Sequence, residues 1–227
     1  MKNLDNFEID SMKFTGALVS GGIFPDIREP LQARPDFSLG FVHRTSASGL
    51  PCYEGKGNYA GVIDLSYRGL RGRKGTINYL TSVTTSDSLV FYLDSCNASV
   101  KNHTVFEQEN GKEFPPAVVD NAYLHWTPYQ DKFFVYTIDS PMSIFKETEL
   151  TGNSVLTPSS MFGTGTLRFK GAEIDSRLFA FKHHELQADT SSLRLFNLNT
   201  GELAFRTDNY NSHVDFKTRK GSFKSNG

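Results

Sequence analysis

Short runs in which apolar and polar residues alternate recur along almost the whole chain. Alternation with period two is typical of a half-buried β-strand, because successive side chains point to opposite faces of a sheet. No window of about twelve residues shows the three- and four-residue apolar spacing of an amphipathic helix. The runs are rich in Phe, Tyr, Val, Ile and Thr, as strands prefer. The clearest are residues 59–65, 76–80, 89–93, 132–138, 166–170, 178–181, 193–196, 203–205 and 214–216.

Turn-forming residues separate these runs. Gly163-Thr-Gly165 and Asn199-Thr-Gly201 are examples, and Gly, Asn and Asp favour tight turns because they tolerate left-handed backbone. The intervals between them fit one strand plus one turn, as in sandwiches and barrels. We therefore predict an all-β chain of stacked short antiparallel strands with little or no helix. The arrangement is expected to be a β-solenoid, a jellyroll-like array or a sandwich.

The chain divides into three parts by composition and self-similarity. Residues 1–60 are rich in Pro and Gly and are predicted to be a loop-rich β segment, in which residues 3–9 alternate like a strand. Gly75 aligns with Gly165 at an offset of 90 residues, and the same offset places Phe91 on Phe181. We predict a first β repeat unit over residues 61–150, then a second unit and the start of a third over residues 151–227. The whole is expected to be a segment of a longer protein.

Charge and composition exclude several classes of partner. The chain has 24 Lys and Arg against 25 Asp and Glu, and 38% of its residues are hydrophobic, which fits a folded domain. A net charge near zero gives no electrostatic basis for binding nucleic acid. We expect no signal peptide and no transmembrane segment in this sequence. Cys52 and Cys96, the two cysteines, leave two alternatives open: a disulfide or a pair of free thiols.

The sequence contains no motif for catalysis or for metal binding. His183-His184-Glu185 differs from the zinc motif H-E-x-x-H, and neighbours on a strand would point to opposite faces of the sheet. The glycine-rich stretch from Gly69 to Thr76 lacks the Gly-Lys-Ser/Thr order of a phosphate loop. We predict no metal, no cofactor and no enzymatic activity.

The strongest candidate for ligand binding is an aromatic cluster in residues 123–136. Thr127-Pro128 interrupts it, which predicts that Trp126 and Tyr129 lie on a loop or edge. Exposed rings there would stack on a sugar, while polar neighbours would bind its hydroxyls. The alternative is that the rings pack into the core. The candidate residues are Tyr123, Trp126, Tyr129, Gln130 and Asp131.

A basic stretch adds two further candidates. Arg71 and Arg73 lie between Arg68 and Lys74, and their guanidinium groups would hold an anionic glycan or a lipid phosphate. The alternative is a solvated hairpin tip that the charges protect from aggregation.

Several short motifs resemble stretches of known proteins. They include Gly22-Ile-Phe-Pro-Asp26, Gly163-Thr-Gly-Thr-Leu-Arg-Phe169 and Lys220-Gly-Ser-Phe-Lys224. These resemble the large, repeat-rich and uncharacterised β proteins of Bacteroidales-type bacteria, which implies an exported parent located in the periplasm, the outer membrane or the extracellular space. The strand-turn rhythm is also similar to the OstA-type β-jellyroll of lipopolysaccharide transport.

Three functions follow in order of preference. The first is a non-catalytic structural or interaction segment of a large cell-envelope or exported protein, with neighbouring β repeats as partners. The second is a binding module for a polysaccharide or lipopolysaccharide. The third is a glycan-active enzyme domain with carboxylates near Asp131 or Asp139. Because the ends of a β array expose strand edges, the chain is also expected to self-associate.

Overall fold

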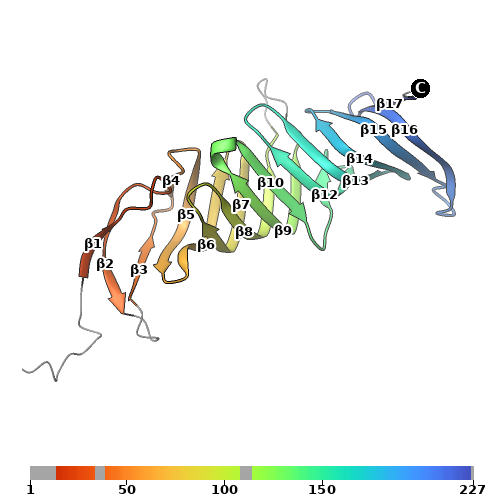
Figure 1. Cartoon of the computed structure of the whole chain (residues 1–227). Coiled ribbons are helices and arrows are strands. Elements are labelled where there is room, and N and C mark those ends of the chain that lie inside the picture. The colour runs from red at the N-terminus through yellow and green to blue at the C-terminus, as the bar shows by residue number, and fades with distance from the viewer. Residues whose placement is uncertain (1–13, 34–38, 108–113, 226–227) are drawn as a thin grey trace, which may run out of the picture.

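The chain folds as an elongated all-β protein, which confirms the predicted fold class (Figure 1). The computed structural model describes residues 14–33, 39–107 and 114–225, so the strand predicted at residues 3–9 lies outside the described part. Among the described residues, one 3₁₀ turn, η2 (Pro128–Gln130), is the only helical element. The strands are β1 (Phe14–Leu18), β2 (Ile27–Ala33), β3 (Leu39–Arg44), β4 (Leu50–Cys52), β5 (Gly57–Ser66), β6 (Gly69–Tyr79), β7 (Ser82–Phe91), β8 (Cys96–Val105), β9 (Ala117–Thr127), β10 (Lys132–Thr137), β11 (Met142–Ile144), β12 (Thr148–Leu156), β13 (Met161–Phe169), β14 (Ala172–Phe181), β15 (Glu185–Phe196), β16 (Leu203–Asp215) and β17 (Lys220–Ser225).

The strands form an antiparallel meander. From β5 to β10 each strand pairs with the next, and the same order continues from β12 to β17. Two pairings join the two runs: β10 pairs directly with β12, and short β11 pairs with both β9 and β12. Consecutive strands lie side by side from one end of the molecule to the other in Figure 1. The predicted unit boundaries at residues 60 and 150 fall inside β5 and β12, so one sheet runs through both.

Most central strands are longer than the predicted runs because their alternation shifts by one residue near the middle. In β7, Ser82, Thr84 and Ser86 are buried, whereas the next buried positions are Leu89 and Phe91. A bulge accommodates the extra residue: the Ser86 hydroxyl accepts the N–H of Ser88 at 3.0 Å and donates to the carbonyl of Ser99 at 2.6 Å. A prediction based on alternation therefore ends the strand at the bulge, although the strand only bends there and continues beyond it.

These bends fold the sheet lengthwise into two layers. Strand register places Tyr79 of β6 level with Ala117, at the start of β9. Trp126 lies near the other end of β9, so about 30 Å of extended strand separates these two levels. Nevertheless, the rings of Tyr79 and Trp126 are 5.4 Å apart. Phe145 and Phe181, which also come from opposite strand ends, are 6.1 Å apart. We call the layer with Tyr79 and Phe145 layer 1, and the layer with Trp126 and Phe181 layer 2.

Large aromatic side chains fill the space between the layers. Trp126, Tyr53, Tyr59 and Phe133 are fully buried. The Tyr59 ring occupies space that a side chain at Gly75 would need, so the glycine-rich stretch of β6 serves packing. Gly69, with φ of +89°, lies at the β5–β6 turn as predicted, whereas Gly72 and Gly75 lie within β6 and are paired with β7.

The loop between β1 and β2 covers the core at its N-terminal end. The N–H of Tyr53 donates to the carbonyl of Ile23 at 2.8 Å, which fixes this loop on the sheet. The Phe24 ring then packs edge-on against Phe91 at 5.0 Å. The loop-rich N-terminal segment therefore contributes directly to the core.

One histidine and both cysteines are enclosed in the core. His103 is buried beside Thr84, whose Oγ1 lies 2.8 Å from its Nδ1, and burial lowers the pKa of His103 to about 4. The imidazole is therefore neutral at pH 7. Cys52 and Cys96 are buried free thiols, and burial raises the pKa of Cys52 to about 12. Neither is an activated nucleophile, because the thiolate is the reactive form.

Candidate functional site

Trp126 lies in the core, so the prediction that it forms part of an exposed platform is wrong. Its side chain is 0% exposed and contacts the rings of Tyr53 and Tyr79. The physical reason is that β9 continues through Thr127 and breaks only at Pro128, which starts η2. Trp126 therefore keeps the inward phase of the strand.

The three residues predicted to accompany Trp126 lie at η2, away from Tyr123. Tyr129 is 46% exposed and packs edge-on against Tyr53 at 6.2 Å. Gln130 ends η2 and is exposed. Asp131 accepts a hydrogen bond from the Lys56 ammonium at 2.8 Å, which joins η2 to the β4–β5 turn. This contact gives Asp131 a structural partner.

The structure places Tyr123 on the same sheet surface as the two predicted arginines. Strand register aligns Arg71, Val90, Asn97, His125 and Phe134 in one row across β6 to β10. Two residues further along each strand, register aligns a second row of Arg73, Ser88, Ser99, Tyr123 and Tyr136. We call these ten residues the Arg–Tyr face. They occupy positions between the buried residues of their strands, so they point away from the core.

Four aromatic rings cluster at one end of the Arg–Tyr face. The ring centroids of Tyr123 and Tyr136 are 6.2 Å apart, and the rings of Phe134 and Tyr136 stack at the same distance. His125 lies 6.1 Å from Phe134, and its Nδ1 is 2.6 Å from the side-chain oxygen of Asn97. Tyr123 is 40% exposed. The sheet therefore presents aromatic surface to solvent next to a polar amide.

The other end of the face is basic. Arg73 forms an ion pair with Asp64, whose side chain is only 3% exposed, while its own side chain is 56% exposed. Arg71 is half-buried and donates from Nε to the Arg68 carbonyl at 3.4 Å. A polar groove of about 370 Å³ is lined by these arginines together with Tyr67. Three arginines and one carboxylate, that of Asp87, line this groove, and Asp87 is itself paired with Lys101 at 2.7 Å, so cations predominate there.

Small side chains separate the two ends of the face. Ser88 and Val90 of β7 and Ser99 and Asn97 of β8 lie between the arginines and the rings. Three strand spacings separate β6 from β9, which is roughly 14 Å. The Arg–Tyr face therefore has cations at one end and aromatic rings at the other.

Three residues of the Arg–Tyr face were not predicted from the sequence as ligand-binding residues. His125, Phe134 and Tyr136 lie in the aromatic cluster of residues 123–136 but are not among the predicted ligand-binding residues. The available signal was the period of two: His125 shares its face with Tyr123, whereas Trp126 is three residues from Tyr123 and lies on the opposite face. Phe134 and Tyr136 then follow from hairpin register with β9.

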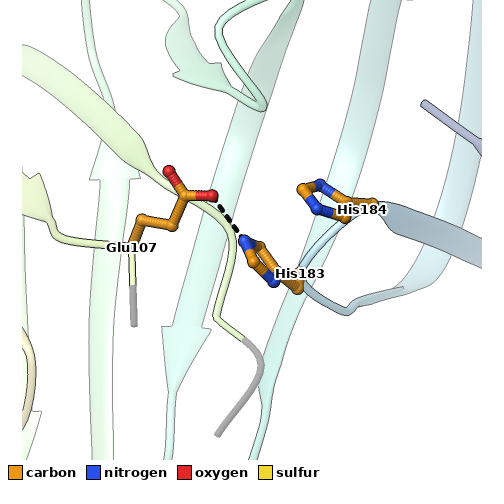
Figure 2. Close-up of side chains that lie close together, drawn as sticks. All are labelled: Glu107, His183 and His184. Carbon is orange, nitrogen blue, oxygen red and sulfur yellow. Dashed lines mark hydrogen bonds and ion pairs between the residues drawn. The ribbon is translucent and has the colours of Figure 1, made fainter. Parts of the chain in front are cut away.

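The reason given for excluding a shared ligand at His183 and His184 is also wrong. The two residues are not on a strand; they are the central pair of the tight turn between β14 and β15, closed by hydrogen bonds between Lys182 and Glu185. Their rings stack with centroids 3.9 Å apart. Figure 2 shows both rings beside Glu107, whose carboxylate is hydrogen-bonded to Nε2 of His183.

No family model, curated protein or solved structure matches this chain. Within the described residues, no helix has the length and apolar character to cross a membrane. Any proposal about function therefore depends on the arrangement of side chains in the structure.

Proposed function

We propose that the chain is a non-catalytic interaction segment whose Arg–Tyr face binds an acidic polysaccharide. The single observation that carries this proposal is the register that aligns Arg71 and Arg73 with four aromatic rings on one face of the sheet, directed away from the core. An acidic sugar chain offers both features that such a surface recognises. Its carboxylate or phosphate groups pair with guanidinium, and the C–H faces of its rings pack on aromatic side chains.

Affinity electrophoresis tests this proposal. The purified chain is run in native gels that contain polygalacturonate, lipopolysaccharide or neutral dextran. We expect the two acidic ligands to retard the chain and dextran to leave its mobility unchanged, because dextran offers no anion to Arg71. The double variant Arg71→Ala, Tyr123→Ala is expected to bind the acidic ligands at least tenfold more weakly, which corresponds to about 1.4 kcal/mol.

A matched double variant provides the control. Arg177→Ala with Tyr92→Ala removes an exposed arginine and an exposed tyrosine outside the Arg–Tyr face and is expected to bind like the parent. Equal loss in both double variants would show non-specific charge attraction. Retardation in dextran equal to that in polygalacturonate would also contradict the proposal.

A second candidate function is an interface with neighbouring β repeats at the C-terminal end. Within the described part of the chain, β17 is in register only with β16. Beside it lies a groove of about 300 Å³, lined mainly by apolar side chains. The occupant that fits is a further β-strand with alternating apolar residues, which would pair with β17 and cover the groove. The apolar lining residues are Phe169, Ala172, Leu195, Val214, Phe216 and Phe223.

The predicted 90-residue repeat is the basis of this second candidate. The Ser86 bulge of β7 recurs at Ser176 in β14, where the hydroxyl accepts the N–H of Leu178 at 3.1 Å. Both serines also lie within hydrogen-bonding distance of a carbonyl on the next strand, that of Ser99 and that of Asp189. Units that repeat in this way bury one another's ends in stacked arrays.

Light scattering after size-exclusion chromatography tests the interface with a second copy of the chain as occupant. We expect the parent's mass to rise with concentration, and Phe223→Glu to remain monomeric at the same concentrations because it places a charge in the groove. Ile138→Glu changes an isoleucine that is 63% exposed between β10 and β11, and it is expected to behave like the parent. A monomeric parent at all concentrations, or an unaltered Phe223→Glu variant, would reject the interface.

A further inference from the structure

Glu107, His183 and His184 come together from distant parts of the chain. Glu107 follows β8 at the edge of layer 1, and the histidines form the β14–β15 turn at the edge of layer 2. One potential ligand atom from each residue lies within 4.8 Å of the other two. Figure 2 shows the carboxylate and the two imidazoles directed toward one another. The cluster thus bridges the seam at which the two layers of the folded sheet meet.

The ligand types at this seam suit a divalent cation. Glu107 offers a carboxylate oxygen, and each of the two histidines offers an imidazole nitrogen. The imidazole rings of His183 and His184 stack with centroids 3.9 Å apart, so both histidines are close enough to serve one metal ion. Glu107 is 41% exposed and His183 is 30% exposed, which leaves room for a bound water molecule.

We propose that Glu107, His183 and His184 form a zinc site that clamps layer 1 to layer 2. Two imidazole nitrogens, one carboxylate oxygen and a water give the four-coordinate set that Zn²⁺ favours, with three protein ligands. Bond lengths of about 2.0–2.2 Å place tetrahedral ligands about 3.4 Å apart, so the three atoms must close by no more than about 1.5 Å. Rotation of partly exposed side chains supplies this movement. Imidazole also selects zinc over magnesium, which prefers oxygen ligands.

Isothermal titration calorimetry with zinc chloride tests the site. We expect one zinc ion per chain, and no saturable binding of magnesium chloride. His184→Asn is the decisive variant, because it removes a proposed ligand and leaves the Glu107–His183 hydrogen bond in place. It is expected to weaken zinc binding at least tenfold while the melting temperature measured in EDTA stays that of the parent. Glu107→Gln is expected to weaken binding in the same way.

His213→Asn is the matched control. His213 lies 3.3 Å from Glu185 in a similar imidazole–carboxylate pair, but the described residues place no second histidine in its pair. It is expected to keep full zinc affinity. Saturating zinc should raise the melting temperature of the parent and of His213→Asn but not of His184→Asn, because a ligand that binds only the folded state stabilises it. Absence of saturable zinc binding, equal affinity in His184→Asn, or equal loss in His213→Asn would each overturn the proposal.

Discussion

Replacing Gly165 with alanine is expected to lower the free energy of unfolding by about 3 kcal/mol or more. Gly165 of β13 is opposite Gly152 of β12, and both have backbone angles that side chains rarely adopt, with φ of +125° and +147°. A Cβ at Gly165 would overlap the carbonyl oxygen of Thr151, and one at Gly152 would overlap that of Thr164. The two strands bend together at this glycine pair, so neither can move without the other.

Urea denaturation followed by circular dichroism measures this effect. Gly201→Ala is the control, because Gly201 also has a positive φ, +71°, yet a Cβ there would have no atom within 4 Å. Gly201→Ala is expected to lower the free energy of unfolding by only about 1–2 kcal/mol, the cost of a left-handed backbone for alanine. If Gly165→Ala were no more destabilising than Gly201→Ala, close packing at the bend would not be needed.

Replacing Trp126 with alanine is expected to cost about 3–5 kcal/mol of unfolding free energy. The indole is fully buried and lies within 5.8 Å of the rings of Tyr53, Tyr79 and Phe133, which come from both layers. Alanine would leave a cavity where the layers meet, and the folded sheet cannot close around it without shifting several strands. Urea denaturation monitored by circular dichroism measures the loss, because the variant has no tryptophan fluorescence.

Trp126→Phe separates packing from loss of the indole N–H. The indole Nε1 is buried and has no hydrogen-bond partner among the described atoms, so phenylalanine removes a polar group that gains nothing from the fold. We therefore expect a much smaller cost than for alanine, about 1–2 kcal/mol. Equal destabilisation by both substitutions would mean that the indole N–H has a favourable interaction.

The fold class was predictable because burial on one face produces alternation in any half-buried strand. The bends were not predictable from the same signal. A bulge such as that at Ser86 moves the buried positions by one residue, so the pattern of Leu89 and Phe91 looks like a separate short strand. The lengthwise fold depends on contacts such as Tyr79 with Trp126, which are remote in sequence and have no local signature.

The candidate site was predictable in part. Arg71, Arg73 and Tyr123 were chosen for their chemistry, and the structure places them on one face. Trp126 was chosen for the same chemistry, but chemistry alone does not distinguish the two faces of a strand. The cluster of His183 and His184 with Glu107 was not predictable. It depends on the conformation of the β14–β15 turn and on the distance of that turn from Glu107, which no spacing in the sequence encodes.

The lengthwise fold also determines how the molecule responds to mechanical force. Its strands run across the long axis seen in Figure 1, so their ladder hydrogen bonds lie along that axis. Tension between the two ends therefore loads one pair of strands at a time, and hairpins peel away in sequence instead of shearing together. A sheet of this kind is expected to yield under tension hairpin by hairpin.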